Sequence, residues 1–327
     1  MAASIDQGRL VIVNQAKEKI RIGISACLIG EKVRYDGGAK TDKYIRDTLS
    51  AYFHWVPVCP EFEMGLGVPR PTLRLQRIEG ETKLVQPASD RDLTGAMEEY
   101  SRARVAALAD QNIFGYLLKS GSPSCGKGGI RVYKGHAIRP DKNGVGVFAK
   151  HLMEANPNLP IEDEGRLKDP GLREHWLNQV FAFHAFRTEL NPSPTIGKLV
   201  RFHTRYKFLV LSHCESTYRQ LGRLVATAKQ EPLRLVLVKY ENALMRALKK
   251  RSTTARHINV MEHMIGFFRK TLDGSTRAEL RASIQDFRLG VVPMIVPMTL
   301  IRHHAKLAGI TYITEQSYLR APTSFSP

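Results

Sequence analysis

The 327-residue chain has few cysteines and no long uninterrupted apolar run. Four cysteines are too few for a disulfide-based scaffold, and none of them forms the C-x-x-C pair common in zinc sites. No apolar run reaches the roughly 20 residues that a membrane-spanning helix needs. Charged residues interrupt the short apolar runs of residues 1–25, which argues against a secretory signal peptide. These absences predict a cytoplasmic protein with reduced thiols and no membrane contact.

Acidic residues are scarce in the last part of the chain. Residues 191–327 contain 22 Lys and Arg against 8 Asp and Glu, a net charge of +14, whereas residues 1–190 carry 27 against 23, a net charge of +4. A regional excess of this kind is typical of a protein that binds a polyanion, most often nucleic acid. The alternative is a generally basic surface with no specific partner.

Strand and helix patterns alternate in the first half of the chain. β-rich or wholly apolar runs predict strands at residues 20–25, 55–58 and 113–118. Helical periodicity and capping residues predict helices over residues 41–52, 92–111 and 144–154. This alternation predicts an α/β N-terminal domain with a mostly parallel sheet.

The second half shows helical patterns and no good strand pattern over most of its length. An amphipathic helix over residues 172–190 ends at the sequence Asn-Pro-Ser-Pro, and six further helical patterns follow it. We therefore expect two domains, residues 1–190 and residues 191–327. The second is predicted to be an all-α helical C-terminal domain.

Three of the four cysteines follow the predicted strands. Cys27 and Cys59 lie within two residues of a strand end, and Cys125 lies in the loop after the third strand. Because parallel strands end at one edge of a sheet, the three thiols would meet at one site. They suit a 4Fe–4S cluster whose fourth iron is open to a soft atom such as sulfur. Small buried cysteines that lie there by chance are the alternative, and Cys214 lies apart from the group.

The loop around Cys125 is rich in glycine and serine. Residues 121–127 fit the phosphate-loop pattern G-x-x-x-x-G-K, but Gly128 stands where that motif needs Ser or Thr to hold magnesium. This departure argues against nucleotide hydrolysis. The amides of such a loop can instead approach a cluster sulfide or a phosphate.

Five short segments around these cysteines resemble a known family. They are Ser-Ala-Cys-Leu-Ile-Gly (25–30), Arg-Tyr-Asp-Gly (34–37), Val-Cys-Pro-Glu (58–61), Lys-Ser-Gly-Ser-Pro-Ser-Cys-Gly (119–126) and Glu-Gly-Arg-Leu (164–167). In this order they resemble the thiouracil desulfidase family, over most of residues 20–190. The resemblance implies a compact α/β domain that removes sulfur from a thiolated pyrimidine with a 4Fe–4S cluster bound by Cys27, Cys59 and Cys125.

The second half resembles the helical domain that is fused to desulfidase domains in tRNA 4-thiouridine desulfidases. This layout implies that the partner is tRNA and that the reaction converts 4-thiouridine to uridine. Two other functions stay open: a desulfidase of free thiouracil or other thiopyrimidines, and a non-enzymatic RNA-binding metalloprotein. The sequence carries no signal for the oligomeric state.

Cleavage of a C–S bond by water needs groups that move protons. Glu61, two residues after a cysteine, is the first candidate for a general acid or base. Ser122 is a candidate donor to the pyrimidine or to the departing sulfur, and Ser120 and Ser124 compete with it. Asp36 is a candidate for contacting the edge of the base, although Asp in a Tyr-Asp-Gly-Gly sequence is also a common turn residue.

Basic residues share helical faces near the start of the second domain. Lys198, Arg201 and Arg205 fall at i, i+3 and i+7 of one predicted helix. Arg219 and Arg223 have an i, i+4 spacing in the next. Such faces neutralise phosphates, which favours RNA binding by these five residues, and an ordinary solvated face is the alternative.

Overall fold

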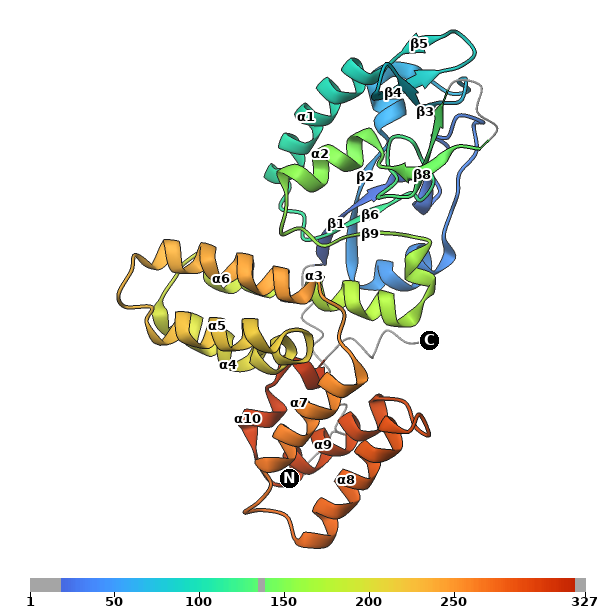
Figure 1. Ribbon diagram of the computed structural model, residues 1–327. Coiled ribbons are helices and arrows are strands. Elements are labelled where there is room, and N and C mark those ends of the chain that lie inside the picture. Colours follow the sequence, from blue (N-terminus) through green and yellow to red (C-terminus); the bar gives the residue numbers. More distant parts are fainter. Residues whose placement is uncertain (1–18, 135–138, 321–327) are drawn as a thin grey trace, which may run out of the picture.

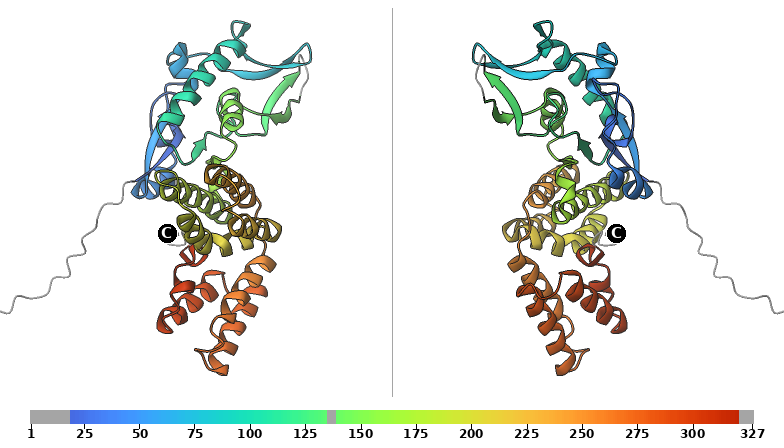
Figure 2. Two further views of the ribbon diagram at one scale, coloured as in Figure 1. Left: turned by 90° about the vertical axis from the view of Figure 1, so that its left-hand side faces the viewer. Right: turned by 90° about the vertical axis from the view of Figure 1, so that its right-hand side faces the viewer.

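The computed structural model describes residues 19–134 and 139–320 (Figure 1). Residues 1–18, on which most of the signal-peptide argument depends, lie outside the described residues. An α/β part and a helical part are stacked end to end, and helix α3 (Pro170–Leu190) lies between them (Figure 2). Within the described ranges no helix is both long and apolar enough to cross a membrane.

The three predicted strands belong to one four-stranded sheet in the order β2-β1-β6-β9. These strands are β1 (Ile20–Ser25), β2 (Phe53–Val58), β6 (Tyr116–Leu118) and β9 (Ile161–Asp163). Every neighbouring pair is parallel, and Ile24 of β1 lies opposite Pro57 on one side and Leu117 on the other. Ile22, Ile24 and Leu117 are fully buried, as expected for a sheet that is covered on both faces. The prediction of an α/β domain with a mostly parallel sheet is confirmed.

A second sheet, which the sequence patterns did not predict, packs beside the first. Its order is β5-β4-β3-β7-β8, and its strands are β3 (Arg74–Ile78), β4 (Glu81–Gln86), β5 (Arg91–Asp92), β7 (Ile130–Lys134) and β8 (Asp141–Gly144). Only β3 and β7 pair in parallel. These strands are short and rich in charged residues, and they bury only a small cluster around Leu75, Leu84 and Val132. They therefore lack the apolar runs by which a strand is recognised.

The helices of the α/β part start later or are shorter than predicted. Helices α1 (Thr94–Asp110) and α2 (Val147–Ala155) are present, but the predicted start of α2 at residue 144 is wrong because Asp141–Gly144 forms β8. The predicted helix over residues 41–52 is two short irregular turns, Tyr44–Thr48 and Leu49–Ala51. Asp42 caps the first turn, since its Oδ1 accepts a hydrogen bond from the amide of Ile45 at 3.1 Å.

The helical part contains all six helices predicted after residue 190. They are α4 (Ile196–His213), α5 (Glu215–Ala226), α6 (Leu233–Leu248), α7 (Thr254–Gly266), α8 (Gly274–Arg288) and α9 (Ile295–Leu307), with the short α10 (Thr311–Thr314) after them. The side chains of Thr195, Thr253 and Asp273 cap α4, α7 and α8. The prediction of an all-α second region is confirmed.

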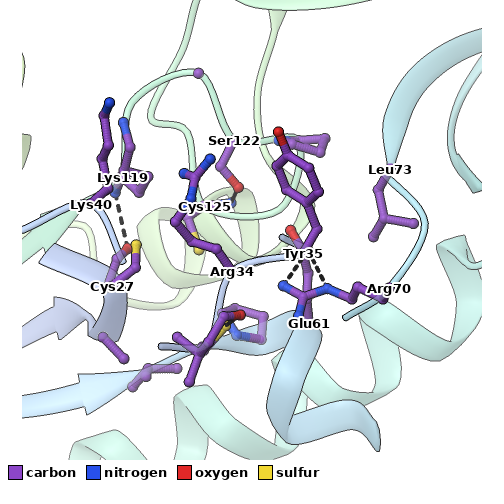
Figure 3. Close-up of a pocket in the computed structure, with 18 of the residues that line it drawn as sticks. Cys27, Arg34, Tyr35, Lys40, Glu61, Arg70, Leu73, Lys119, Ser122 and Cys125 are labelled. Atoms are coloured by element: carbon purple, nitrogen blue, oxygen red, sulfur yellow. Dashed lines mark hydrogen bonds and ion pairs between the residues drawn. The ribbon is translucent and has the colours of Figure 1, made fainter. Parts of the chain in front are cut away.

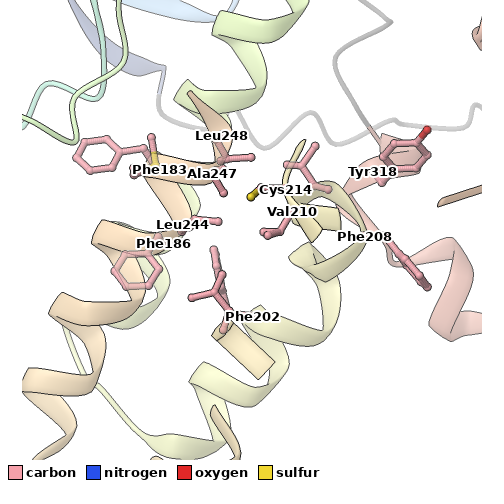
Figure 4. Packing of buried hydrophobic residues seen from close by; sticks show 14 of the residues in the cluster. Phe183, Phe186, Phe202, Phe208, Val210, Cys214, Leu244, Ala247, Leu248 and Tyr318 are labelled. Atoms are coloured by element: carbon pink, nitrogen blue, oxygen red, sulfur yellow. The ribbon is translucent and has the colours of Figure 1, made fainter. Parts of the chain in front are cut away.

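Helix α3 contributes side chains to both parts. Near its start, Trp176 is buried against the first sheet, and its Nε1 donates to the carbonyl of Pro160 at 3.2 Å. Near its end, Phe186 points toward the core of the helical part, beside Leu244 and Phe202 (Figure 4). Its ring stacks on Tyr240 of α6, with ring centroids 5.7 Å apart. The ion pair of Arg187 with the buried Glu241, 2.6 Å from Nε to Oε2, fixes the same contact. The division at residue 190 stays a prediction, because α3 packs in both cores.

Phe202 of α4 tests how far stability depends on this core. Its ring is 0% exposed and contacts Phe186, Tyr206 and Tyr240. Phe202→Ala should lower the free energy of unfolding by about 3–5 kcal/mol, because it leaves a cavity in a close-packed core. Val200 lies on the other side of the same helix and is 43% exposed, so Val200→Ala should change stability by less than about 0.5 kcal/mol. Chemical denaturation measures both, and equal losses would contradict this description of the core.

Candidate functional site

The three cysteine-bearing loops meet at the carboxyl edge of the first sheet. Cys27 lies in a short helical turn (Ala26–Ile29) directly after β1, Cys59 follows β2 at once, and Cys125 lies in the loop after β6. All three line one cavity of about 360 Å³. Figure 3 shows the side chains of Cys27 and Cys125 on one side of this cavity, with Tyr35 and Leu73 across from them. All three thiols are free of disulfides.

The chemistry of these donors fits an iron–sulfur cluster. Thiolates are the usual ligands of such clusters, and a cluster is larger than one ion, so its ligands stand farther apart. Within the described ranges, no three His, Cys, Asp or Glu side chains converge closely enough to hold a single metal ion. Three soft donors around one cavity therefore suit a cluster better than mononuclear zinc.

Burial keeps these thiols protonated when nothing is bound to them. It raises the pKa of Cys27 to about 11, and the neighbouring Cys59 adds to the effect. Burial also raises the pKa of Cys59, and it raises that of Cys125 well above the usual range. Since thiols bind metals as thiolates, a positively charged metal group must supply the charge that favours deprotonation.

Cationic side chains surround the thiols. Arg34, Lys40 and Lys119 line the same cavity. Lys119 is held in place, because its ammonium group pairs with Glu164 and its amide donates to Ser25 Oγ at 2.9 Å. Positive charge along this wall favours thiolates, sulfide and other anions inside the cavity.

Glu61 is fixed by two neighbours and joins two of the loops. Its Oε2 accepts from Arg70 Nη2 at 2.8 Å, and its Oε1 accepts from Ser124 Oγ at 2.9 Å. The Arg70 side chain is only 3% exposed, so the ion pair is shielded from water. Glu61 also lines the cavity, where its carboxylate is held in one orientation.

The three candidate serines have different partners. Ser122 Oγ accepts from the amide of Cys125 at 3.0 Å, which leaves its own proton available to a group in the cavity. Ser120 Oγ donates to Glu164 at 2.8 Å, and Ser124 donates to Glu61. The geometry therefore favours Ser122 as a donor to a bound molecule.

Asp36 lies in a turn, and the tyrosine before it lines the cavity. The Oδ1 of Asp36 accepts from the amide of Gly38 at 3.0 Å, and Asp36 is absent from the described lining of the cavity. Tyr35 is 41% exposed, and the guanidinium of Arg34 lies 5.3 Å from the centre of its ring. A ring at the mouth of a cavity can stack on a planar base. Tyr35 is not among the site residues predicted from the sequence, although it stands in the same motif as Asp36.

The five basic residues proposed for RNA binding lie on α4 and α5. Lys198, Arg201 and Arg205 line one shallow depression of the surface. Some of the charge is already paired, because Arg205 binds Glu189 and Arg219 binds Glu215 at 2.6 Å. Within the described part of the chain, Lys198, Arg201 and Arg223 have no ion pair and carry the free charge of this face.

The fold and the three thiols define an α/β domain built around a cysteine-lined site. A family model described as 2-thiouracil desulfurase matches residues 22–164, and one described as a protein of unknown function (DUF1722) matches residues 207–322. The chain belongs to the 2-thiouracil desulfurase family, with the second, helical domain after it.

Individual relatives each cover less than half of the chain. The uncharacterized protein YbbK of Bacillus subtilis (strain 168) is 31% identical over 43% of this chain and 95% of its own length. The uncharacterized protein YbgA of Escherichia coli (strain K12) is 31% identical over 43% of this chain and 85% of its own length. A solved structure named as the 4Fe-4S-dependent thiouracil desulfidase TudS is 30% identical, over 47% of this chain and 97% of that one, with a TM-score of 0.38.

The raised pKa of Cys27 predicts how its thiol reacts after metal has been removed. Alkylation needs the thiolate. Its rate at Cys27 should therefore be low at pH 7 and should rise with pH until about pH 11. At Cys214, the hydrogen bonds of Ser216 and Thr217 outweigh the opposing effect of burial and lower the pKa to about 6, so its rate should level off near neutral pH. Mass spectrometry of anaerobic, chelator-treated protein after iodoacetamide pulses measures both profiles. A plateau for Cys27 below pH 9 would contradict the burial described here.

Proposed function

We propose that this protein is a 4Fe–4S-dependent desulfidase that converts 4-thiouridine in tRNA to uridine. The observation that carries the proposal is the meeting of three free thiols, two buried and one partly buried, at one cavity in a domain of the 2-thiouracil desulfurase family. Cys27, Cys59 and Cys125 would hold the cluster. A cluster held there would supply Lewis-acid chemistry suited to a soft sulfur atom, through an iron that has no protein ligand.

The reaction adds water and releases sulfide. The ring carbon gains an oxygen from water and loses sulfur as H₂S, so no net oxidation or reduction is needed. Tyr35 stacks on the pyrimidine at the mouth of the cavity. Ser122 donates a hydrogen bond to the ring or to the departing sulfur, and Glu61, oriented by Arg70, accepts a proton from the attacking water and returns it to the departing sulfur. The cations along the wall favour the anionic sulfide as it forms.

The proposal of tRNA as the substrate is supported by the second domain. It carries +14 of the net charge of +18, and α4 and α5 present basic residues to solvent. A thiolated base inside a folded RNA must leave its stack to enter a cavity of this size. Backbone contacts from the helical part would offset that cost, while the α/β part performs the chemistry. Free thiouracil or free 4-thiouridine is the alternative substrate, since either would enter the same cavity.

Cysteine substitutions test the cluster. In full-length protein reconstituted without oxygen, Cys27→Ala, Cys59→Ala and Cys125→Ala should each lose most of the iron–sulfide absorbance and of the sulfide release, because each removes a ligand. Cys214→Ala is the matched control, since Cys214 lies in the helical part and hydrogen-bonds Thr217 at 3.3 Å. It should keep both signals. Normal iron content in all three ligand variants would refute the assignment.

Competing substrates test the preference for tRNA. Anaerobic incubation with thiolated tRNA should convert its 4-thiouridine to uridine with an equal amount of sulfide, as measured by mass analysis of nucleosides. The kcat/KM for tRNA should exceed that for free 4-thiouridine by at least about tenfold, because remote contacts add binding energy. Arg201→Ala should raise KM for tRNA alone, whereas Arg288→Ala, which removes an exposed charge at the end of α8, should not. Equal kcat/KM values for both substrates would favour the free thiopyrimidine instead.

A further inference from the structure

A second cavity, of about 330 Å³, lies where the α/β part meets the helical part. The loop after Cys125, strand β9, helix α3 and the turn after α6 all contribute to its walls. Four cationic side chains line it: Lys127, Arg166, Lys249 and Arg251. We call it the junction pocket. It shares no lining residue with the cysteine cavity, and the function proposed above leaves it without a role.

Positive charge in the junction pocket exceeds negative charge. Among its described lining residues, Glu162 supplies the only carboxylate. That carboxylate is 6% exposed, and its Oε1 accepts from Lys127 Nζ and from Arg166 Nε, both at 2.9 Å. Four cations against one carboxylate leave a formal excess of +3. Glu162 therefore holds two of the cations in position without neutralising the pocket.

The other two cations have no counter-ion. Within the described ranges, neither Lys249 nor Arg251 forms an ion pair. Lys249 donates to the carbonyl of Pro157, which anchors the turn after α6 to the loop after α2. Burial lowers the pKa of Lys249, and the nearby charge of Lys127 lowers it further. Like charges that are brought together and partly desolvated in this way favour an anion between them.

We propose that the junction pocket binds a phosphate group of the nucleotide substrate, and that the backbone of tRNA supplies it. The proposal rests on the function inferred above. Phosphate matches this set of donors, because guanidinium and ammonium groups form charge-assisted hydrogen bonds with its oxygens. Arg166 offers its remaining nitrogens besides the Nε that is bound to Glu162, and Arg251 lines the pocket without an ion pair within the described ranges.

The place of the pocket explains what a phosphate there would do. Lys127 lies two residues after Cys125, so one loop lines the cysteine cavity with residues 119–123 and 125 and the junction pocket with residue 127. Glu162 and Glu164 stand two residues apart around the end of β9, where Glu162 binds Lys127 and Glu164 binds Lys119. A phosphate in the junction pocket would therefore set the position of the RNA relative to the thiols.

Binding of an unthiolated tRNA transcript tests the proposal without any chemistry, so its result does not depend on whether thiolated tRNA is turned over. The double variant Lys249→Ala/Arg251→Ala should weaken tRNA binding by about tenfold or more at low salt, measured by fluorescence anisotropy. The slope of log Kd against log salt concentration should fall by about 1, because the two substitutions together remove the cations that neutralise the one phosphate in the pocket. The charge-preserving variant Lys249→Arg/Arg251→Lys should keep most of the affinity.

Controls separate this pocket from general charge and from another source of phosphate. Arg102→Ala/Lys142→Ala removes two exposed cations of the α/β part, on α1 and β8, and should leave the slope unchanged. Melting temperatures show whether each variant is folded. Uridine 5′-monophosphate is the second probe: a loss of affinity confined to tRNA supports a backbone phosphate, and an equal loss for the monophosphate overturns the tRNA backbone as the source. An unchanged Kd and slope for tRNA in the folded double alanine variant would overturn the proposal.

Discussion

The parallel pairing of β1 with β2 and β6 is the constraint on which the rest of the site depends. Ser25 pairs with Val58 and Ile24 pairs with Leu117, so the three strands end at the same level of the sheet. Cysteines that are 32 and 66 residues apart in the sequence then lie in three neighbouring loops. A slip of one residue in either pairing would exchange the side chains on the two faces of a strand and would displace its cysteine-bearing loop by about 3.3 Å along the strand. The pairing of the strands thus sets the positions of the loops and of the three thiols that they carry.

Much of this arrangement is visible in the sequence because it depends on apolar runs. Ile20–Ser25 reads as a buried strand because both faces of β1 are covered, and the cysteine after it inherits its place from that strand. The same reasoning does not find the second sheet, since Arg74–Ile78 has only two apolar residues in a segment of five. Apolar patterns also do not predict which polar side chains become partners in the folded chain. Arg70 lies nine residues from Glu61 in sequence, and nothing in the pattern indicates that the two form a shielded ion pair.

The cysteine cavity and the junction pocket are both lined by cationic side chains, but the balance of charge favours a different kind of ligand in each. In the cysteine cavity, burial disfavours charge on the thiols, and the cations along the wall pull in the opposite direction. The balance favours a ligand that is itself positive and becomes enclosed by thiolates. In the junction pocket, the cations outnumber the single carboxylate, and the balance favours an anion. Glu162 and Glu164, on either side of Asp163, bind Lys127 of the junction pocket and Lys119 of the cysteine cavity. The end of β9 therefore links the two cavities, although we propose no ligand-binding residue there.

The loop between the two cavities is rigid enough to act as a spacer. A side chain at Gly126 would begin 2.1 Å from Ile130 Cδ1, and one at Gly146 would begin 2.5 Å from the carbonyl oxygen of Ser124. Backbone packed this closely has no room to shift, and the amide of Gly146 donates to the carbonyl of Gly126 at 2.9 Å. Close packing thus holds the backbone at Gly126, between Cys125 and Lys127. A polymer held by its phosphates at one end of this loop would present its bases at a constant offset from the thiols at the other end. A free base has no phosphate to place, so the spacer would be of use only to a nucleotide or a nucleic acid.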